Sequence, residues 1–141
     1  SQVYIAERML VHDLLRGGLA LERVMRYRVD YRARVLDAVL PAYGGVSHSF
    51  DDFVWWFTGL QPGEEQALVK EWLAPWKAFI HGRVDEASAE WYAGKQPDGR
   101  LVRVLRKDGE VSVESDARWE EKHELIEAML RVRSELVDEY L

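Results

Sequence analysis

Residues 96–115 read QPDGRLVRVLRKDGEVSVES and contain the clearest secondary-structure pattern in the chain. Turn signals at Asp98-Gly99 and Asp108-Gly109 flank the strand-forming run at residues 101–105. After the second turn, residues 111–113 alternate between apolar and polar side chains, as a strand with one buried face does. The pattern predicts an antiparallel hairpin, with both Asp-Gly pairs at reversals of the sheet.

The stretch just before the hairpin, residues 84–93, is compatible with two structures. Its Ala and Glu residues favour a helix, but Ala87, Ala89 and Trp91 alternate with polar residues, which favours a strand. We interpret it as a strand, so residues 84–115 predict a three-stranded meander, and the hairpin alone is the alternative.

Helical patterns occupy the rest of the chain. Residues 6–15 favour a helix that ends at Gly17-Gly18, because glycine adopts the left-handed conformation that follows many helices. The longest helical candidate covers residues 19–40, where apolar side chains recur every three or four positions. Another helix is expected to begin near Glu64, with a kink or restart at Pro75.

The final helix is expected over residues 116–140, with Ser115 or Asp116 as its cap. Its buried stripe is predicted to contain Trp119, Ile126, Met129, Leu136 and Tyr140. The chain is therefore predicted to be a single α+β domain, helical over residues 1–82 and mainly β over residues 84–115.

Composition excludes several classes of protein. A chain of 141 residues that is 48% hydrophobic and 31% charged fits one globular domain without a membrane span. The absence of cysteine excludes disulfides, a thiol nucleophile and thiolate metal sites. The chain also lacks Asn and has more Arg than Lys, which fits a hot or GC-rich bacterial setting.

Charge is unevenly distributed along the chain. The net charge is −6, and residues 108–141 carry eleven acidic against four basic residues. Such a balance opposes phosphate approach, so we expect no direct sequence-specific binding of nucleic acid and no membrane contact. Glu120, Glu124 and Glu127 form an acidic flank on the final helix that could face a basic protein partner.

No constellation of residues predicts catalysis, a cofactor or a metal site. Glu120 and His123 have the spacing of one half of a di-iron ligand set, but no second such pair exists. His48, Asp51 and Asp52 lie close in sequence, and capping of a short helix, by Ser49 or Asp51, is the preferred interpretation.

Aromatic and basic residues supply two further candidate surfaces. The chain has six tryptophans, and the adjacent Trp55 and Trp56 cannot both point inward on one helix, so one is expected to be exposed as a partner anchor. Arg100, Arg103 and Arg106 place positive charge on the predicted hairpin, as in the wing of some DNA-binding proteins.

From SQVYIAERMLVHDLL at its start to ELVDEYL at its end, the chain resembles small early proteins of bacteriophages that infect thermophilic bacteria. The likeness covers the whole chain and its Asn-free, Cys-free, Trp-rich character, and no short motif carries it. It implies a non-enzymatic regulator that binds host RNA polymerase through the β-subunit flap and the sigma factor C-terminal region. Such a regulator inhibits initiation and promotes antitermination in the cytoplasm of the infected cell.

Two alternatives from other classes remain open. The first is a small DNA-binding regulator that uses the basic hairpin. The second is a small hydrolase or metal enzyme whose catalytic residues lie far apart in sequence.

Overall fold

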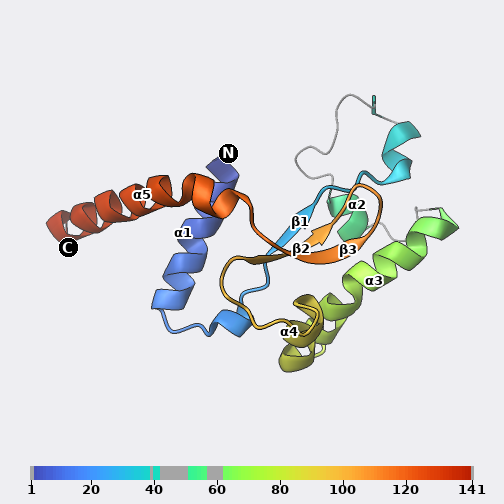
Figure 1. Ribbon diagram of the computed structural model, residues 1–141, viewed down its shortest axis with the longest axis horizontal. Coiled ribbons are helices and arrows are strands. Elements are labelled where there is room, and N and C mark those ends of the chain that lie inside the picture. The colour runs from blue at the N-terminus through green and yellow to red at the C-terminus, as the bar shows by residue number, and fades with distance from the viewer. Residues whose placement is uncertain (1, 39, 42–50, 57–61, 141) are drawn as a thin grey trace.

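The computed structural model describes residues 2–38, 40–41, 51–56 and 62–140 (Figure 1). One strand lies in the first third of the chain and two follow the central helices, and η denotes a 3₁₀ helix. The elements are α1 (Gln2–Arg16), η1 (Leu21–Arg23), β1 (Tyr27–Val29), η2 (Arg34–Ala38), α2 (Asp52–Trp55), α3 (Gly63–Ile80), α4 (Val84–Trp91), β2 (Leu101–Leu105), β3 (Val111–Ser115) and α5 (Arg118–Tyr140). The predicted α+β class and the long C-terminal helix are confirmed.

The sheet of the described residues has three strands in the order β1-β2-β3. The predicted hairpin is confirmed, since β2 and β3 are antiparallel with Leu105 opposite Val111. Gly109 in its turn has a φ of +89°, and its N–H donates to the Arg106 carbonyl at 3.0 Å. Gly99 also has a positive φ but lies in the loop between α4 and β2, so Asp98-Gly99 is not a sheet reversal.

The prediction of one helix over residues 19–40 is wrong. Two 3₁₀ helices flank β1 there, and β1 pairs in parallel with β2, with Tyr27 beside Arg103 and Val29 beside Leu105. Aromatic and β-branched residues such as these favour a strand once a neighbouring strand is available. Apolar spacing within the segment could not reveal that neighbour, because it lies more than seventy residues further along the chain.

The prediction of a strand over residues 84–93 is also wrong, because residues 84–91 form helix α4. Ala87 and Trp91 are four residues apart and therefore share one helix face, which is buried. The indole N–H of Trp91 donates to the Arg26 carbonyl at 2.8 Å, which fixes α4 beside the start of β1. The third strand of the sheet is thus β1, and it is parallel rather than part of a meander.

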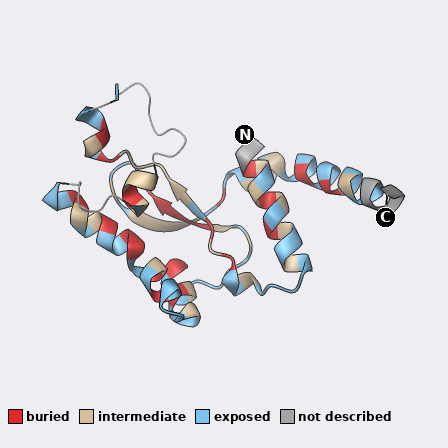
Figure 2. Cartoon of the chain, turned by 180° about the vertical axis from the view of Figure 1, so that it is seen from behind, coloured by how far each residue is buried: buried red, intermediate tan, exposed pale blue. Residues whose placement is uncertain are grey.

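Helix α3 covers one side of the sheet, and its inner face is buried together with β2 (Figure 2). The main core contains Val54, Val69, Trp72, Leu73 and Leu105. The helix includes Pro75 in its interior and runs on to Ile80, so the helix does not restart at this proline. This core holds α2, α3 and β2 together.

Helices α1 and α5 pack against each other and extend away from the sheet (Figure 1). Their shared core contains Tyr4, Ile126 and Leu130. The predicted burial of Ile126 is confirmed, whereas Met129 is 39% exposed. Asp116 caps α5 as expected, since its Oδ1 accepts the Arg118 N–H at 3.1 Å. None of the described helices is both long and apolar enough to cross a bilayer.

Candidate functional site

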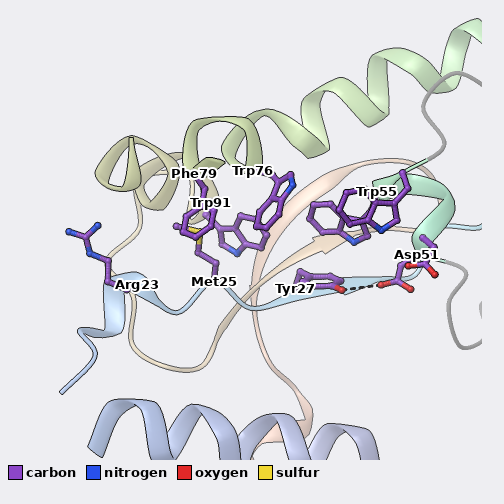
Figure 3. Close-up of a pocket in the computed structure, with 10 residues that line it drawn as sticks. Arg23, Met25, Tyr27, Asp51, Trp55, Trp76, Phe79 and Trp91 are labelled. Atoms are coloured by element: carbon purple, nitrogen blue, oxygen red, sulfur yellow. Dashed lines mark hydrogen bonds between the residues drawn. The ribbon is translucent and has the colours of Figure 1, made fainter. Parts of the chain in front are cut away.

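A pocket of about 310 Å³ opens where α2, α3 and α4 meet β1 (Figure 3). Most of the residues around it are aromatic or otherwise apolar, and the few charged ones lie at its rim. It is lined by Arg23, Met25, Tyr27, Asp51, Asp52, Trp55, Trp56, Trp76, Phe79 and Trp91. The volume is at the lower end of the range typical of small-molecule sites, about 300–1,000 Å³.

The aromatic walls come from elements that are distant in sequence. The ring centroids of Tyr27 on β1 and Trp55 on α2 are 5.2 Å apart, edge to face. Trp76 on α3 lies 5.8 Å from Trp55 and stacks on Phe79 at 5.3 Å. Trp91 of α4 is buried, and its ring lies 6.5 Å from that of Tyr27. Folding of the sheet and three helices therefore assembles the pocket.

At the polar rim of the pocket, the Tyr27 hydroxyl donates a hydrogen bond to the Asp51 carboxylate at 3.0 Å (Figure 3). Burial raises the pKa of Tyr27 to about 12, and the negative charge of Asp51 adds to this effect. The prediction that the Asp51 side chain caps the short helix is wrong, since it makes no cap bond. Ser49 and His48, which were considered with it, lie outside the described residues.

The expectation that one of the two adjacent tryptophans is exposed is confirmed. Trp56 is 68% exposed, whereas Trp55 is half-buried between Tyr27 and the ring of Trp72. Both side chains line the pocket. Of the residues predicted to bind a partner, these two are the ones that the structure brings to this site.

Of the three arginines predicted to bind a partner, Arg100 and Arg106 are exposed, whereas the prediction is wrong for Arg103, which is buried. Arg103 is only 6% exposed, and its guanidinium donates to the backbone carbonyls of Glu90 at 3.0 Å and Glu71 at 3.3 Å. Strand residues alternate between faces, and Arg103 occupies the face that α3 and α4 cover. The carbonyl oxygens accept from Nη1 and Nη2, whereas Nε is buried without a hydrogen-bond partner among the described residues.

The other two arginines of the hairpin are also engaged. Arg106 forms an ion pair with Glu114 on β3, with Nη2 and Oε1 2.7 Å apart. The guanidinium of Arg100 lies 5.7 Å from the ring of Trp119. The carboxylate of Glu114 also pairs with Arg28 at 3.3 Å, so much of the positive charge on this surface is compensated.

The predicted acidic flank lies on α5, on the arm formed with α1 and away from the pocket. Glu124 and Glu127 are exposed there, and the side chain of Glu120 is outside the part of the chain that the structure describes. The helix also exposes apolar side chains, among them Leu125 at 48% and Val132 at 55%.

Several residues of the pocket were assigned other roles from the sequence. Tyr27 and Met25 lie in the segment predicted as the helix over residues 19–40, and no pattern in the sequence pointed to Phe79. The frequency of tryptophan was the one useful signal, since four of the six line the pocket. Among the described residues no three His, Asp or Glu side chains gather as a metal site would require.

Comparison with known proteins finds a curated protein that is similar to most of this chain. A Schizosaccharomyces pombe protein named as an uncharacterized esterase/lipase is 30% identical over 122 residues, which cover 84% of this chain and 21% of that protein. The chain thus spans about a fifth of the length of this curated relative. No family model matches the chain, and no solved structure matches it significantly.

This relative overturns the functional prediction of a non-enzymatic transcription regulator from a bacteriophage. A match over 84% of the chain to a protein with a hydrolase name conflicts with a non-enzymatic role and gives no support to sigma-factor binding or antitermination. A small hydrolase, which was the second alternative from the sequence, agrees better with the similarity to this protein. Binding to RNA polymerase and location in an infected bacterial cell are predictions that these comparisons leave untested.

Proposed function

We propose that this chain is part of an esterase/lipase-like hydrolase and that its aromatic pocket binds the apolar portion of an ester. The observation that carries the proposal is the 30% identity over 122 residues to a protein with that name. The pocket supports it, because it joins a mostly aromatic wall to a small number of polar groups, as sites for small organic ligands do.

The chemistry of the walls indicates which part of an ester would enter. The rings of Trp55, Trp76 and Phe79 offer apolar faces to an acyl or alkyl chain, which loses its contact with water on binding. Asp51 and Arg23 lie at the rim and would stay with the polar ester group or with water. We therefore assign the pocket to the hydrophobic tail of the substrate.

The proposal assigns substrate binding, and not the nucleophile, to this chain. Esterases and lipases of the α/β-hydrolase fold carry the nucleophilic serine in a Gly-x-Ser-x-Gly turn, and the 141 residues contain no such sequence. In that fold the histidine follows the serine and the acid along the chain. Since His48 precedes Asp51, this aspartate is not the triad acid in that order. His48 is nevertheless the histidine nearest in sequence to the acidic rim of the pocket, so it is the candidate that we would test first.

The first experiment measures hydrolysis of p-nitrophenyl acetate, butyrate and octanoate by the protein expressed in full. Trp56→Ala removes an exposed wall of the pocket without opening the core, so we expect KM for the octanoate ester to rise roughly tenfold, with the acetate ester changed little. Trp119→Ala is the matched control, since this tryptophan lies on α5 outside the pocket. Absence of hydrolysis with all three esters would reject the proposed function.

The second experiment replaces each histidine separately with glutamine. General-base catalysis contributes about 10²- to 10⁴-fold, so we expect His48→Gln to lower kcat by at least a hundredfold. His12, His81 and His123 lie on or beside described helices and do not line the pocket, so their variants serve as controls. If all four variants keep full activity, the base lies elsewhere in the protein.

A further inference from the structure

The outer edge of β1 presents backbone groups that no described strand pairs with. Arg103 donates its N–H to the Arg26 carbonyl at 3.1 Å, and Asp30 donates its N–H to the Leu105 carbonyl at 2.8 Å. Because alternate residues of a strand direct their backbone groups to the same side, Tyr27 and Val29 direct theirs away from β2. Their N–H and C=O groups therefore form the outer edge of the sheet.

A groove of about 690 Å³ runs along this edge. One wall contains all of residues 24–29, consecutively. Successive side chains of a strand point to opposite faces, so a hollow over one face would be lined by alternate residues only. A lining of consecutive residues shows that the groove follows the edge itself, where hydrogen bonds with a further strand would form.

The facing wall is a stripe on α1. Glu7, Val11 and Leu14 line the groove from positions that share one side of a helix, and Leu19 follows at its end. Leu14 is 42% exposed and Leu19 is 37% exposed, so apolar surface is open to the groove. The groove thus offers hydrogen-bonding groups on one side and apolar contacts on the other, which is what an inserted β-strand requires.

The direction of pairing indicates the kind of strand. Parallel strands occur mainly in larger sheets whose two faces are covered, and such sheets often carry one antiparallel strand at an edge. Here β1 and β2 are parallel, and β3 is antiparallel to β2. Strand β3 therefore corresponds to the antiparallel edge strand, and β1 lies on the side where a larger sheet would continue. A second copy related by a two-fold axis would instead meet β1 in antiparallel orientation.

We propose that the outer edge of β1 binds a further β-strand, parallel to β1 and supplied by the rest of an esterase/lipase-like protein. This inference rests on the proposed function, because the occupant comes from the four-fifths of such a protein that the match does not cover. Leu14 and Leu19 then contact the apolar side chains of the added strand, and the Tyr27 and Val29 amides donate to its carbonyls.

The test is amide hydrogen exchange, resolved by residue, in the protein expressed in full. We expect Tyr27 and Val29 to exchange at least a hundredfold more slowly than an unstructured amide, as slowly as Arg28, which bonds to β2 in either case. Rapid exchange at Tyr27 and Val29 with protection at Arg28 would show a free edge and overturn the proposal. Protection that appears only as the protein concentration rises would identify a second copy, which also overturns it.

A pair of variants provides an independent measurement. Val29→Pro removes an N–H that faces the groove, and proline is tolerated on a strand whose N–H faces solvent. We expect Val29→Pro to lower the Tm of the full protein clearly more than Val29→Ala, which alters the side chain and keeps the N–H. Equal Tm values would mean that nothing pairs at this edge.

The two proposals can fail separately. Slow exchange at Tyr27 and Val29 in a protein without ester hydrolysis would reject the proposed function alone. Fast exchange at these residues in an active enzyme would reject this inference alone.

Discussion

The guanidinium of Arg26 and the carboxylate of Asp116 form a buried ion pair, with Nη2 and Oδ2 2.6 Å apart. Each residue is 5% exposed. Tyr4 of α1 donates its hydroxyl to the same carboxylate at 2.9 Å, and Glu7 accepts from Arg26 Nε at 2.9 Å. One charge cluster therefore joins α1, the segment that enters β1 and the residue that caps α5.

Removal of one partner of this pair is expected to destabilise the protein strongly. Asp116→Ala leaves the Arg26 guanidinium buried without its nearest counter-charge, and such losses cost about 3–5 kcal/mol. Urea denaturation of the variant measures the change. Arg34→Ala is a suitable control, since Arg34 and its partner Glu64 are both exposed and such pairs contribute about 1 kcal/mol or less. Equal losses in the two variants would contradict this account.

The same pair predicts how stability depends on pH. Burial alone would raise the pKa of Asp116, but the hydrogen bonds from Arg26 and Tyr4 outweigh it and hold the pKa below its ordinary value. Because the folded-state pKa is depressed, the contribution is complete above the unfolded pKa of about 3.9 and is lost as pH falls through the folded value. The free energy of unfolding is measured from about pH 6 down to about pH 2, a range that brackets the unfolded pKa of about 3.9. Over this range it should fall more steeply in the parent protein than in Asp116→Asn.

Two arginines of the hairpin are expected to respond very differently to substitution. Arg103→Leu abolishes buried hydrogen bonds to the Glu90 and Glu71 carbonyls, which should cost about 2–4 kcal/mol. Arg106→Leu removes a half-exposed pair with Glu114 and should change stability by about 1 kcal/mol or less. Thermal unfolding of the two variants compares them directly. A larger loss at Arg106 would place the hairpin in another orientation.

The hairpin turn depends on glycine at position 109. Its φ of +89° is unfavourable for a β-branched residue, so Gly109→Val should cost on the order of 1 kcal/mol or more. A new Cβ would also lie 3.5 Å from Leu68 Cδ2. Gly63→Ala is the control, because this glycine opens α3 without a positive φ and alanine favours helices. Chemical denaturation should therefore show opposite signs for the two changes.

The phenol of Tyr27 reports on the rim of the aromatic pocket. Burial and the neighbouring charge of Asp51 raise its pKa to about 12, so Asp51→Asn should lower that pKa toward the ordinary value of about 10. Carbon NMR of tyrosine labelled at the ring carbon that bears the hydroxyl follows this ionisation separately from the other tyrosines. An unchanged titration would mean that Asp51 does not lie beside the phenol.

Local patterns in the sequence were sufficient for elements that depend on nearby residues. The hairpin around Gly109, the stop after α1 and the cap at Asp116 each follow from residues within one turn of the chain. The same reasoning separated Trp55 from Trp56, because neighbours on one helix face different directions.

The misassigned segments depend on distant residues. Tyr27 belongs to a strand only because β2 lies beside it, and Arg103 is buried only because α3 and α4 cover its face. The spacing of Ala87 and Trp91 is compatible with both a strand and a helix, and packing of α4 against α3 decides between them. The aromatic pocket combines all of these contacts, so no single segment predicts it.

The parallel pairing of β1 with β2 also sets an order of events in folding. The β2–β3 hairpin closes over a few residues, whereas the Arg26–Asp116 and Tyr4–Asp116 bonds span 90 and 112 positions. Closing a long loop is slow, so contacts between residues this far apart in sequence form late in folding. Because α1 and β1 are synthesised before β2 and α5, their residues wait longest for these native neighbours. A chaperone that binds exposed apolar segments would therefore have the longest time to bind at Leu14 and Leu19.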